Sequence, residues 1–563
     1  MDNASFAFTL GKGSATTPVL TEALCRYRKL LFPPNLNKGR RVHSTVQQEE
    51  AAGGDEEDLV AAAAKLTGCE VVIDSASEDI QLGFDESYVL SVPTSGIATI
   101  HAPTVYGALH GLETLTQMVE FDRETARTGV GRISAVPIKI TDEPRFKHRG
   151  LMLDTARHYL PVAYIRTHIE AMAAAKLNTL HWHLSDIQSF PFQSEVHPKL
   201  SEYGAYDPDY AIYTHDNVKG IVQHAKAHGI RVVPEFDTPG HTGSWFRGHP
   251  ELQGNTKGGA MDPTSEVVYD FLDKLVGELA TLFPDDVLHL GCDELPLGLW
   301  DTPAIDGWKA AKGINTSAAL ETYWLERVHD IGKKHGKRIT VWHDPLDNGA
   351  TIGKDAVVEA WNGDSKFANN FAAQGWETIM AAPFYLDATG KQWADFYGVD
   401  FPPNKNATIE AKMLGGEACM WSEWVDAPPR DSDPQELSSG PRNICYCESL
   451  WKICRLMRPA YHSWGPESRA QVDATNSVNR VWPRAAAVSE NLWAPADGSN
   501  PLLAQFASKR MAQWRCRMLL RGVSAEPIEG GLLTPDPWCG RQRPRRNYTA
   551  VHSRLCSFLQ SIL

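Results

Sequence analysis

The chain has 563 residues and a mass of 62.3 kDa, which is too long for one ordinary domain. Its 69 acidic and 55 basic residues give a net charge of −14, which makes it a poor candidate for binding nucleic acid or an anionic membrane through bulk charge. At 42% hydrophobic and 22% charged residues, and with no apolar run near the about 18 residues of a membrane span, a globular fold without a span is expected.

The first part of the chain predicts a small α+β domain that ends near Asp142. Strands are expected over 88–92 and 98–101, and helical spacing runs over 59–66 and 106–119. The polar, charge-blocked stretch 38–58 has the composition of a mobile loop. No tryptophan occurs here: all 17 follow, from Trp182 onwards.

From His148 onwards, short apolar runs alternate with amphipathic stretches. The eight runs are 150–153, 179–184, 231–236, 287–290, 339–342, 357–361, 378–382 and 412–418. Helices are expected between most of them, over 162–176, 217–228, 267–283 and 318–335. Gly229 and Gly336 stand where a helix C-terminus favours glycine.

Eight strands with crossover helices predict an α/β fold, a (β/α)8 TIM barrel preceded by the small α+β domain. A doubly wound sheet would need fewer strands and a glycine-rich phosphate loop after the first one, and the sequence has no such loop. We expect the domains to span 1–143, 144–525 and, as a C-terminal tail, 526–563.

One stretch, 428–473, interrupts the path from the eighth strand to a helix expected over 478–492. The tripeptide Val-Asp-Ala stands on both sides of it, at 425–427 and 472–474. The stretch contains Cys445, Cys447 and Cys454, but their spacing matches no standard zinc pattern.

The ten cysteines do not indicate a disulfide scaffold, although Cys25 with Cys69 and Cys516 with Cys539 are candidate bridges. No basic stretch followed by an apolar one opens the chain, so no signal peptide is predicted. Four glycosylation sequons, at Asn3, Asn315, Asn406 and Asn547, weakly favour secretion.

The side chains that follow the eight strands should meet at one rim, because the active site of a barrel lies at the carboxyl ends of its strands. In strand order they are Asp154 and Arg157; His181, Trp182, His183 and Asp186; Glu235, Asp237 and His241; Asp293 and Glu294; Trp342, His343 and Asp344; Trp361; Tyr385 and Asp387; and Glu417, Trp421 and Glu423. Aromatic planes cover the C–H faces of sugars, while carboxylates accept from hydroxyls and supply acid–base catalysis. The rim therefore indicates a carbohydrate substrate.

Asp293 and Glu294 form the sharpest feature of this rim. Two adjacent carboxylates repel one another and raise one pKa, which suits a general acid near neutral pH. Consecutive side chains diverge, so the two cannot be the facing pair of an ordinary glycosidase. Two different roles are therefore predicted.

Alternative interpretations accompany the other rim residues. Asp154 is predicted to brace the fold, and Arg157 either clamps hydroxyls or only neutralises nearby acids. A metal amidohydrolase would use His181 and His183 on one face with Trp182 on the other, but we expect one of the two histidines to face the barrel interior and the other the helices. Further metal-ligating His and Lys at later strand ends are not evident, so no metal or other cofactor is predicted.

The sequence resembles the β-N-acetylhexosaminidases of glycoside hydrolase family 20, most closely the eukaryotic lysosomal or secreted type. The resemblance runs from about Thr21 to Pro527 and is carried by PRFKHRGLMLDTARHYLP (144–161), NTLHWHLSDIQSFPFQS (178–194), RVVPEFDTPGHTGSW (231–245), LHLGCDEL (288–295), APFYLD (382–387) and GGEACMWSEWVD (415–426). It implies exo-hydrolysis of terminal GlcNAc or GalNAc by substrate-assisted catalysis.

The resemblance also implies roles for individual residues. Glu294 would be the general acid and then the base, Asp293 would hold the substrate's acetamido N–H, and Tyr385 would bind the acetamido oxygen that attacks C1. Asp186 and His241 would form a relay behind Glu294. The acetamido pocket would be walled by Trp342, Trp361 and Trp421, and hydroxyls would be bound by Arg157, Asp387 and Glu423.

The motif Tyr385-Leu386-Asp387-Ala388 resembles the chain type that acts on neutral sugars. The resemblance further implies a carbohydrate with a terminal N-acetylhexosamine as the partner, a homodimer as a candidate assembly, and a lysosomal, vacuolar or secreted location. A non-enzymatic, lectin-like relative remains the alternative, although every proposed catalytic side chain is present.

Some segments depart from the family pattern. Cys292 stands where relatives usually have glycine, and His343-Asp344 replaces the usual Gln-Glu or similar pair. Relatives also carry a signal peptide and a first strand that are missing here, so the first domain is expected to be truncated at its start. Deleting 427–473 restores the usual continuation of the family, so we hypothesise a retained intron there, with a genuine loop insertion as the alternative.

Overall fold

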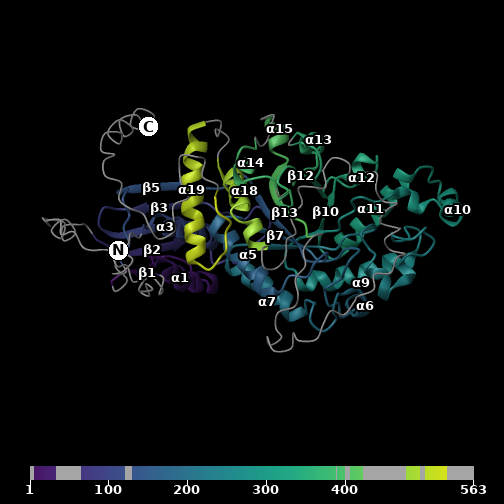
Figure 1. Ribbon diagram of the computed structural model, residues 1–563, viewed down its shortest axis with the longest axis horizontal. Helices are drawn as coiled ribbons and strands as arrows, with labels where there is room; N and C mark the ends of the chain where they lie inside the picture. The colour runs from purple at the N-terminus through teal and green to yellow at the C-terminus, as the bar shows by residue number, and fades with distance from the viewer. Residues whose placement is uncertain are drawn as a thin grey trace, which may run out of the picture.

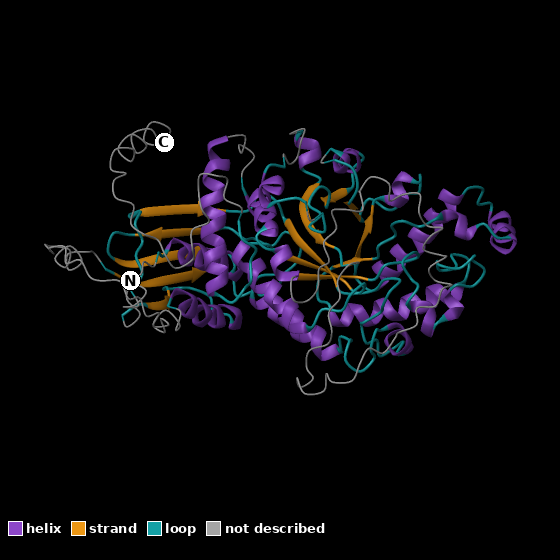
Figure 2. Cartoon of the chain, viewed as in Figure 1, coloured by secondary structure: helices purple, strands orange, loops and turns teal. Residues whose placement is uncertain are grey.

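The computed structural model describes residues 5–32, 65–120, 130–364, 366–388, 390–399, 406–422, 477–494 and 501–528 (Figure 1). Two units follow one another in these residues: an N-terminal mixed sheet with helices, and a closed parallel barrel (Figure 2). The insert 428–473, the predicted loop 38–58 and the tail from 529 lie outside the described residues.

The N-terminal sheet has the order β1-β2-β4-β3-β5. Its strands are β1 (Ala7–Leu10), β2 (Leu66–Ile73), β3 (Tyr88–Val92), β4 (Gly96–Ala102) and β5 (Ile138–Asp142). Helices α1 (Pro18–Leu31) and α3 (Val105–Met118) share one hydrophobic core with the sheet, and each begins at a threonine whose side chain accepts from the first turn. The expected strands 88–92 and 98–101 and the expected helix 106–119 are confirmed. The helical pattern 59–66 lies almost wholly outside the described residues, and Leu66 begins β2 instead.

Eight parallel strands close into a ring in chain order, with the last strand paired to the first. They are β6 (His148–Asp154), β7 (Thr179–His183), β8 (Arg231–Glu235), β9 (Val287–His289), β10 (Arg338–Trp342), β11 (Val357–Ala360), β12 (Glu377–Met380) and β13 (Met413–Met420). Nearly every residue of these strands is buried, since helices cover the outside and side chains fill the inside. The predicted TIM barrel is confirmed.

The crossover helices also follow the predicted pattern. They include α5 (Val162–Ala175), α7 (His215–Ala227), α9 (Glu266–Leu282) and α11 (Ser317–Lys334). Gly229 and Gly336, just after α7 and α11, have φ of 77° and 72°, the left-handed backbone expected of C-terminal caps. Shorter elements are α6 (Lys199–Gly204), α8 (Trp245–Gly248), η1 (Pro250–Leu252), η2 (Leu297–Trp300), α10 (Pro303–Lys312), α12 (Asp344–Asp347), α13 (Phe367–Ala373), α14 (Trp393–Tyr397) and α15 (Ala407–Glu410).

The helix expected over 478–492 is two helices, α17 (Ser477–Val481) and α18 (Arg484–Trp493). Pro483 separates them, because proline has no amide hydrogen for a continuing helix. The last described helix, α19 (Pro501–Leu520), lies against the N-terminal unit, where its Arg517 donates to the carbonyl of Gln117 in α3. No described helix is long and apolar enough to cross a membrane.

A buried carboxylate joins the two units. Glu86, which precedes β3, accepts from both terminal nitrogens of Arg149 in β6 at 3.0 and 2.5 Å, and from Asn178 at 2.9 Å. His110 of α3 lies 2.9 Å from the same carboxylate. Burial would raise the pKa of Glu86, but Arg149 and His110 outweigh it and lower this pKa to about 2.

Two expectations about side chains are wrong. His181 and His183 both face the barrel interior, because residues two apart on a strand share a face, and Trp182 between them packs among the helices against Tyr213. Cys25 and Cys69 are free thiols. Cys516 is disulfide-bonded, and its pairing with Cys539 stays a prediction because Cys539 lies outside the described residues.

Candidate active site

The predicted rim residues gather at the carboxyl ends of the barrel strands. Within the described residues, the structure brings together Asp186, His241, Asp293 and Glu294 on one side and Trp342, Trp361, Tyr385 and Trp421 on the other. Asp387 follows Tyr385 after β12 and is half-buried. Glu423 lies outside the described residues, so its place at the rim stays a prediction.

The turn after β9 separates the two neighbouring carboxylates. Its residues Gly291, Cys292 and Glu294 have φ of 68°, 73° and 48°, in the left-handed region that L side chains adopt only at a cost of order 1–3 kcal/mol. Cys292 thus occupies a backbone conformation that favours glycine. The turn buries Asp293, whose side chain is 10% exposed, and leaves that of Glu294 27% exposed.

The two carboxyls titrate differently, and one of the two pKa values is raised, as predicted. Burial raises the pKa of Asp293 to about 7, helped by the nearby charges of Asp344 and Glu294. Burial also acts on Glu294, but the contact with His241 outweighs it and lowers the pKa of Glu294. The raised pKa belongs to the buried Asp293 rather than to Glu294, to which the family resemblance assigns the role of general acid.

Asp186, His241 and Glu294 lie in a row, the arrangement that the predicted relay requires. His241 Nδ1 lies 3.2 Å from one oxygen of Asp186, and its Nε2 lies 3.6 Å from Glu294 and 3.7 Å from Asp293. Burial would lower the pKa of His241, but the surrounding carboxylates raise it well above its ordinary value. His241 is therefore a cation that faces Glu294 from one side and Asp186 from the other.

Arg157 is held tightly at the edge of this group. Its guanidinium lies 3.3 Å from Asp154 and 3.0 Å from Asp186, and it stacks over the ring of Trp421 with 4.7 Å between the guanidinium carbon and the ring centroid. Asp154 also accepts from the backbone N–H groups of Arg157 and Ser422. Asp154 thus braces the loops after β6 and β13.

Four aromatic rings line the other side of the rim. The rings of Trp342 and Trp421 are 5.9 Å apart, and Tyr385 lies 6.4 Å from Trp361 and 6.5 Å from Trp421. Such a group of rings presents flat apolar surfaces, which suit an acetamido group or a sugar face.

Two residues of the site were noted in the sequence without a role. Asp344 accepts from the Trp361 indole N–H at 2.5 Å and from the backbone N–H of Glu294 at 3.3 Å, so it joins the aromatic group to the turn that carries Glu294. Asp237 accepts from the backbone N–H of Cys292 at 3.1 Å and shares the buried surroundings of Asp293. Their positions after strand ends were the only available signal, because both act through residues distant in sequence.

His183 does not offer the lone pair that the His-x-His metal alternative requires. Both ring nitrogens of His181 lie 2.6 and 3.1 Å from Glu417 and Glu235, and those of His183 lie 2.5 and 3.0 Å from Glu235 and Asp186. His183 therefore donates twice at neutral pH, which leaves it no nitrogen for a cation. This protonation disfavours the His-x-His metal alternative.

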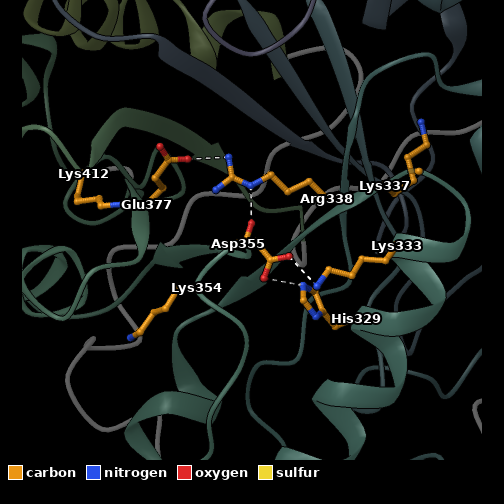
Figure 3. A pocket seen from close by; sticks show the side chains of 9 residues that line it. His329, Lys333, Lys337, Arg338, Lys354, Asp355, Glu377 and Lys412 are labelled. Carbon is orange, nitrogen blue, oxygen red and sulfur yellow. Dashed lines mark hydrogen bonds and ion pairs between the residues drawn. The ribbon is translucent and has the colours of Figure 1, made fainter.

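A surface cavity of about 530 Å³ lies away from this rim (Figure 3). Arg338 and Glu377, which begin β10 and β12, line it, so it lies at the opposite end of the barrel. Its side chains are mainly basic, with Asp355 paired to Lys333 at 2.8 Å. None of the predicted site residues lines this cavity.

Comparisons with known proteins agree with this geometry. The family model described as glycosyl hydrolase family 20, catalytic domain, matches residues 146–453, and one described as beta-acetyl hexosaminidase like matches residues 1–118. The chain belongs to glycosyl hydrolase family 20. It is a glycoside hydrolase of the β-N-acetylhexosaminidase type, which removes terminal GlcNAc or GalNAc with participation of the substrate's acetamido group.

Relatives of this family 20 chain cover most of its length. It is 35% identical to mouse beta-hexosaminidase subunit beta, over 82% of this chain and 78% of that protein. It is 32% identical to rat beta-hexosaminidase subunit alpha, over 94% and 90%. Among solved structures, a Flavobacterium johnsoniae chitobiase superposes with a TM-score of 0.70 at 27% identity, over 93% of this chain and 70% of that one.

Proposed function

We propose that Glu294 donates a proton to the glycosidic oxygen and later accepts one from water, while Asp293 holds the acetamido N–H of the substrate. This proposal rests on one observation: the turn after β9 points the side chains of Asp293 and Glu294 into different surroundings. Glu294 is the more exposed side chain and contacts the cation His241, whereas Asp293 is buried. An exposed carboxyl can reach a glycosidic oxygen, and a buried one can orient an amide.

The aromatic wall supports the second half of the mechanism. With the acetamido group seated among Trp342, Trp361 and Trp421, its carbonyl oxygen attacks C1 as Glu294 protonates the leaving oxygen. The Tyr385 hydroxyl holds the acetamido oxygen in place for this attack. Water activated by Glu294 then adds at C1 and restores the acetamido group, so the configuration at C1 is retained.

The remaining groups bind and orient. Asp186 and His241 keep a positive charge beside Glu294, which favours its ionised form after the proton has left. Arg157, fixed by Asp154 and Asp186, binds sugar hydroxyls together with Asp387 and Glu423. Asp387 followed by Ala388 favours neutral over sulfated sugars.

A homodimer and a lysosomal, vacuolar or secreted location complete the proposal. Both rest on the family resemblance, and four glycosylation sequons support passage through the secretory route. The domain limits 1–143, 144–525 and 526–563 belong to the same proposal.

The decisive experiment assays the recombinant chain, with and without 427–473, on an aryl N-acetylglucosaminide and on the matching 2-hydroxy glucoside. We expect hydrolysis of the first, insensitive to chelators, and essentially none of the second, because only the first carries the internal nucleophile. Glu294→Gln should abolish turnover of the first. An Asp293→Asn rate equal to that of the wild type would refute the orienting role.

A further inference from the structure

Glu235 ends β8 below the rim, where three imidazoles and one indole surround it. Its side chain is fully buried. One oxygen lies 2.5 Å from His183 Nδ1 and 3.1 Å from His181 Nε2, and the other accepts from the Trp342 indole N–H at 2.8 Å and lies 3.2 Å from His289 Nδ1. Burial would raise the pKa of Glu235, but the three imidazoles hold it well below its ordinary value.

The contact with His183 leads to the relay behind Glu294. His183 Nε2 lies 3.0 Å from the Asp186 oxygen Oδ2, while the other oxygen of Asp186 faces His241. Burial opposes the charge of His183, but Glu235 and Asp186 raise its pKa to about 9, so the ring donates to both carboxylates at neutral pH. Arg157 is the other cation on Asp186, at 3.0 Å.

The contact with Trp342 leads to the aromatic wall. The Trp342 ring is fully buried, and its indole N–H has Glu235 as the acceptor. A buried N–H without a partner is unfavourable by about 1–3 kcal/mol, so this bond fixes the plane that the ring presents to Trp421, 5.9 Å away.

We propose that Glu235 is a positioning residue that holds the Asp186–His241–Glu294 relay through His183 and the acetamido wall through Trp342. One carboxylate thus sets the charge behind the acid and the shape of the pocket that receives the substrate's own nucleophile. The inference rests on the proposed roles of Glu294 and Trp342 and adds to them a residue that touches neither substrate nor the reacting atoms.

The relay is tested by Glu235→Gln. The Gln oxygen still accepts from Trp342, but the amide cannot keep His183 positive, so the cation 3.0 Å from Asp186 is lost. With that charge gone, His241 and Glu294 keep their protons to higher pH. We expect the basic limb of the kcat/KM profile to move up by about 0.5–1 pH unit, with KM changed less than about twofold.

The wall is tested by Trp342→Phe, which keeps an aromatic plane but removes the N–H. We expect KM to rise roughly five- to tenfold, as loss of one buried hydrogen bond gives, with the pH limbs unmoved. Glu417→Gln is the matched control. It neutralises another fully buried carboxylate, bonded to His181 at 2.6 Å and His148 at 2.9 Å, that contacts neither Asp186 nor Trp342.

The outcomes separate cleanly. A shifted basic limb in Glu235→Gln but not in Glu417→Gln supports the proposal. If the basic limb of the kcat/KM profile does not shift in Glu235→Gln, or shifts equally in both variants, Glu235 has only a structural role and the proposal is overturned. Thermal melts of both variants identify any loss of folding, and inactivity of the wild-type chain itself would reject the proposed function instead.

Discussion

Asp293 and Glu294 are neighbours in the chain, yet their carboxyls have opposite pKa shifts. The difference comes from burial of Asp293 and from the cation His241 at 3.6 Å from Glu294. The pKa of each of these carboxyls is therefore set by its surroundings rather than by the type of residue. Two predictions follow from the charges of single side chains at the rim.

The raised pKa of Asp293 predicts that the protein is more stable in mild acid than at neutral pH. A carboxyl whose folded pKa is about 7 binds its proton more tightly in the folded state. Its contribution is fully present below the unfolded pKa near 3.8 and is lost as pH rises through about 7. We expect Asp293→Asn to raise the free energy of unfolding at pH 7.5 by roughly 2–4 kcal/mol and to leave it nearly unchanged at pH 3.5.

Thermal or denaturant unfolding of both proteins at the two pH values checks this. Asp306→Asn is the control, because that carboxylate is 58% exposed on α10 and should give no pH-dependent difference. Equal effects of Asp293→Asn at both pH values would contradict the expectation.

Asp387 predicts discrimination against anionic sugars. A sulfate at the sugar 6-position near this carboxylate meets like charge, which costs about 1–3 kcal/mol. We expect kcat/KM for a 6-sulfated aryl N-acetylglucosaminide to be about 10–100-fold below that for the plain substrate. In Asp387→Asn, kcat/KM should fall for both substrates, but the preference for the plain over the sulfated substrate should become smaller. Comparable turnover of the two substrates by the wild type would contradict this explanation.

At the scale of elements, the turn after β9 is the feature on which the site depends. Three non-glycine residues at the rim, His241, Cys292 and Glu294, have positive φ, and Gly291 begins the strained turn. Strain of this kind persists only where the surrounding packing holds it, and it gathers at functional sites. Here it turns one carboxyl inward and its neighbour outward.

Gly291→Ala is predicted to disable the site through Asp237. A Cβ at this position would lie 1.8 Å from an oxygen of Asp237, which accepts from Cys292 N–H and neighbours Asp293. Either the Asp237 carboxylate or the turn after β9 must therefore move. A displacement of about 1 Å at a catalytic group lowers the rate by about 100-fold. We expect a fall in kcat of at least that order.

The matched control is Gly313→Ala after α10. Its φ of 72° is close to the 68° of Gly291, but a Cβ there meets nothing within 4 Å. It therefore shares the backbone strain without the clash. Similar losses of activity in the two variants would show that strain rather than Asp237 matters.

At the scale of the whole molecule, Glu86 holds the N-terminal unit to the barrel. Its folded pKa of about 2 lies below the ordinary 4.5, so its contribution to stability is present above pH 4.5 and is lost as pH falls towards 2. We expect Glu86→Gln to lower the free energy of unfolding at pH 7 by about 3 kcal/mol or more, because Arg149 loses its buried partner.

Urea unfolding at pH 7 and pH 2 measures this, and the difference between variant and wild type should shrink at the lower pH. Glu266→Gln serves as the surface comparison. Its pair with Arg327 is largely exposed, 69% on the Glu266 side, and should contribute under about 1 kcal/mol. If both variants lost a similar amount of unfolding free energy, the buried pair of Glu86 and Arg149 would contribute no more than an exposed pair.

Much of the barrel could be predicted from the sequence, because the signals that mark its strands and helices lie within short stretches of the chain. All eight strands were found within two or three residues, since each is a short apolar run between helices with recognisable caps. The predicted barrel was enough to place Asp186, His241, Asp293 and Glu294 at one rim, because all four follow the carboxyl ends of strands. The strands β1, β2 and β5 of the N-terminal sheet were not predicted, and Pro483 divides the single helix expected over 478–492 into α17 and α18.

Other features were decided only by the tertiary structure. Which carboxyl of the Asp293–Glu294 pair has the raised pKa depends on burial and on His241, which stands more than 50 positions away. Glu235 and Asp344 are single acidic residues in the sequence, and only the closed barrel brings indoles and imidazoles to them. The sequence determined which residues reach the rim, because strand order and strand ends are local properties. The fold determined what each does there, because charge and hydrogen bonding depend on neighbours from other strands.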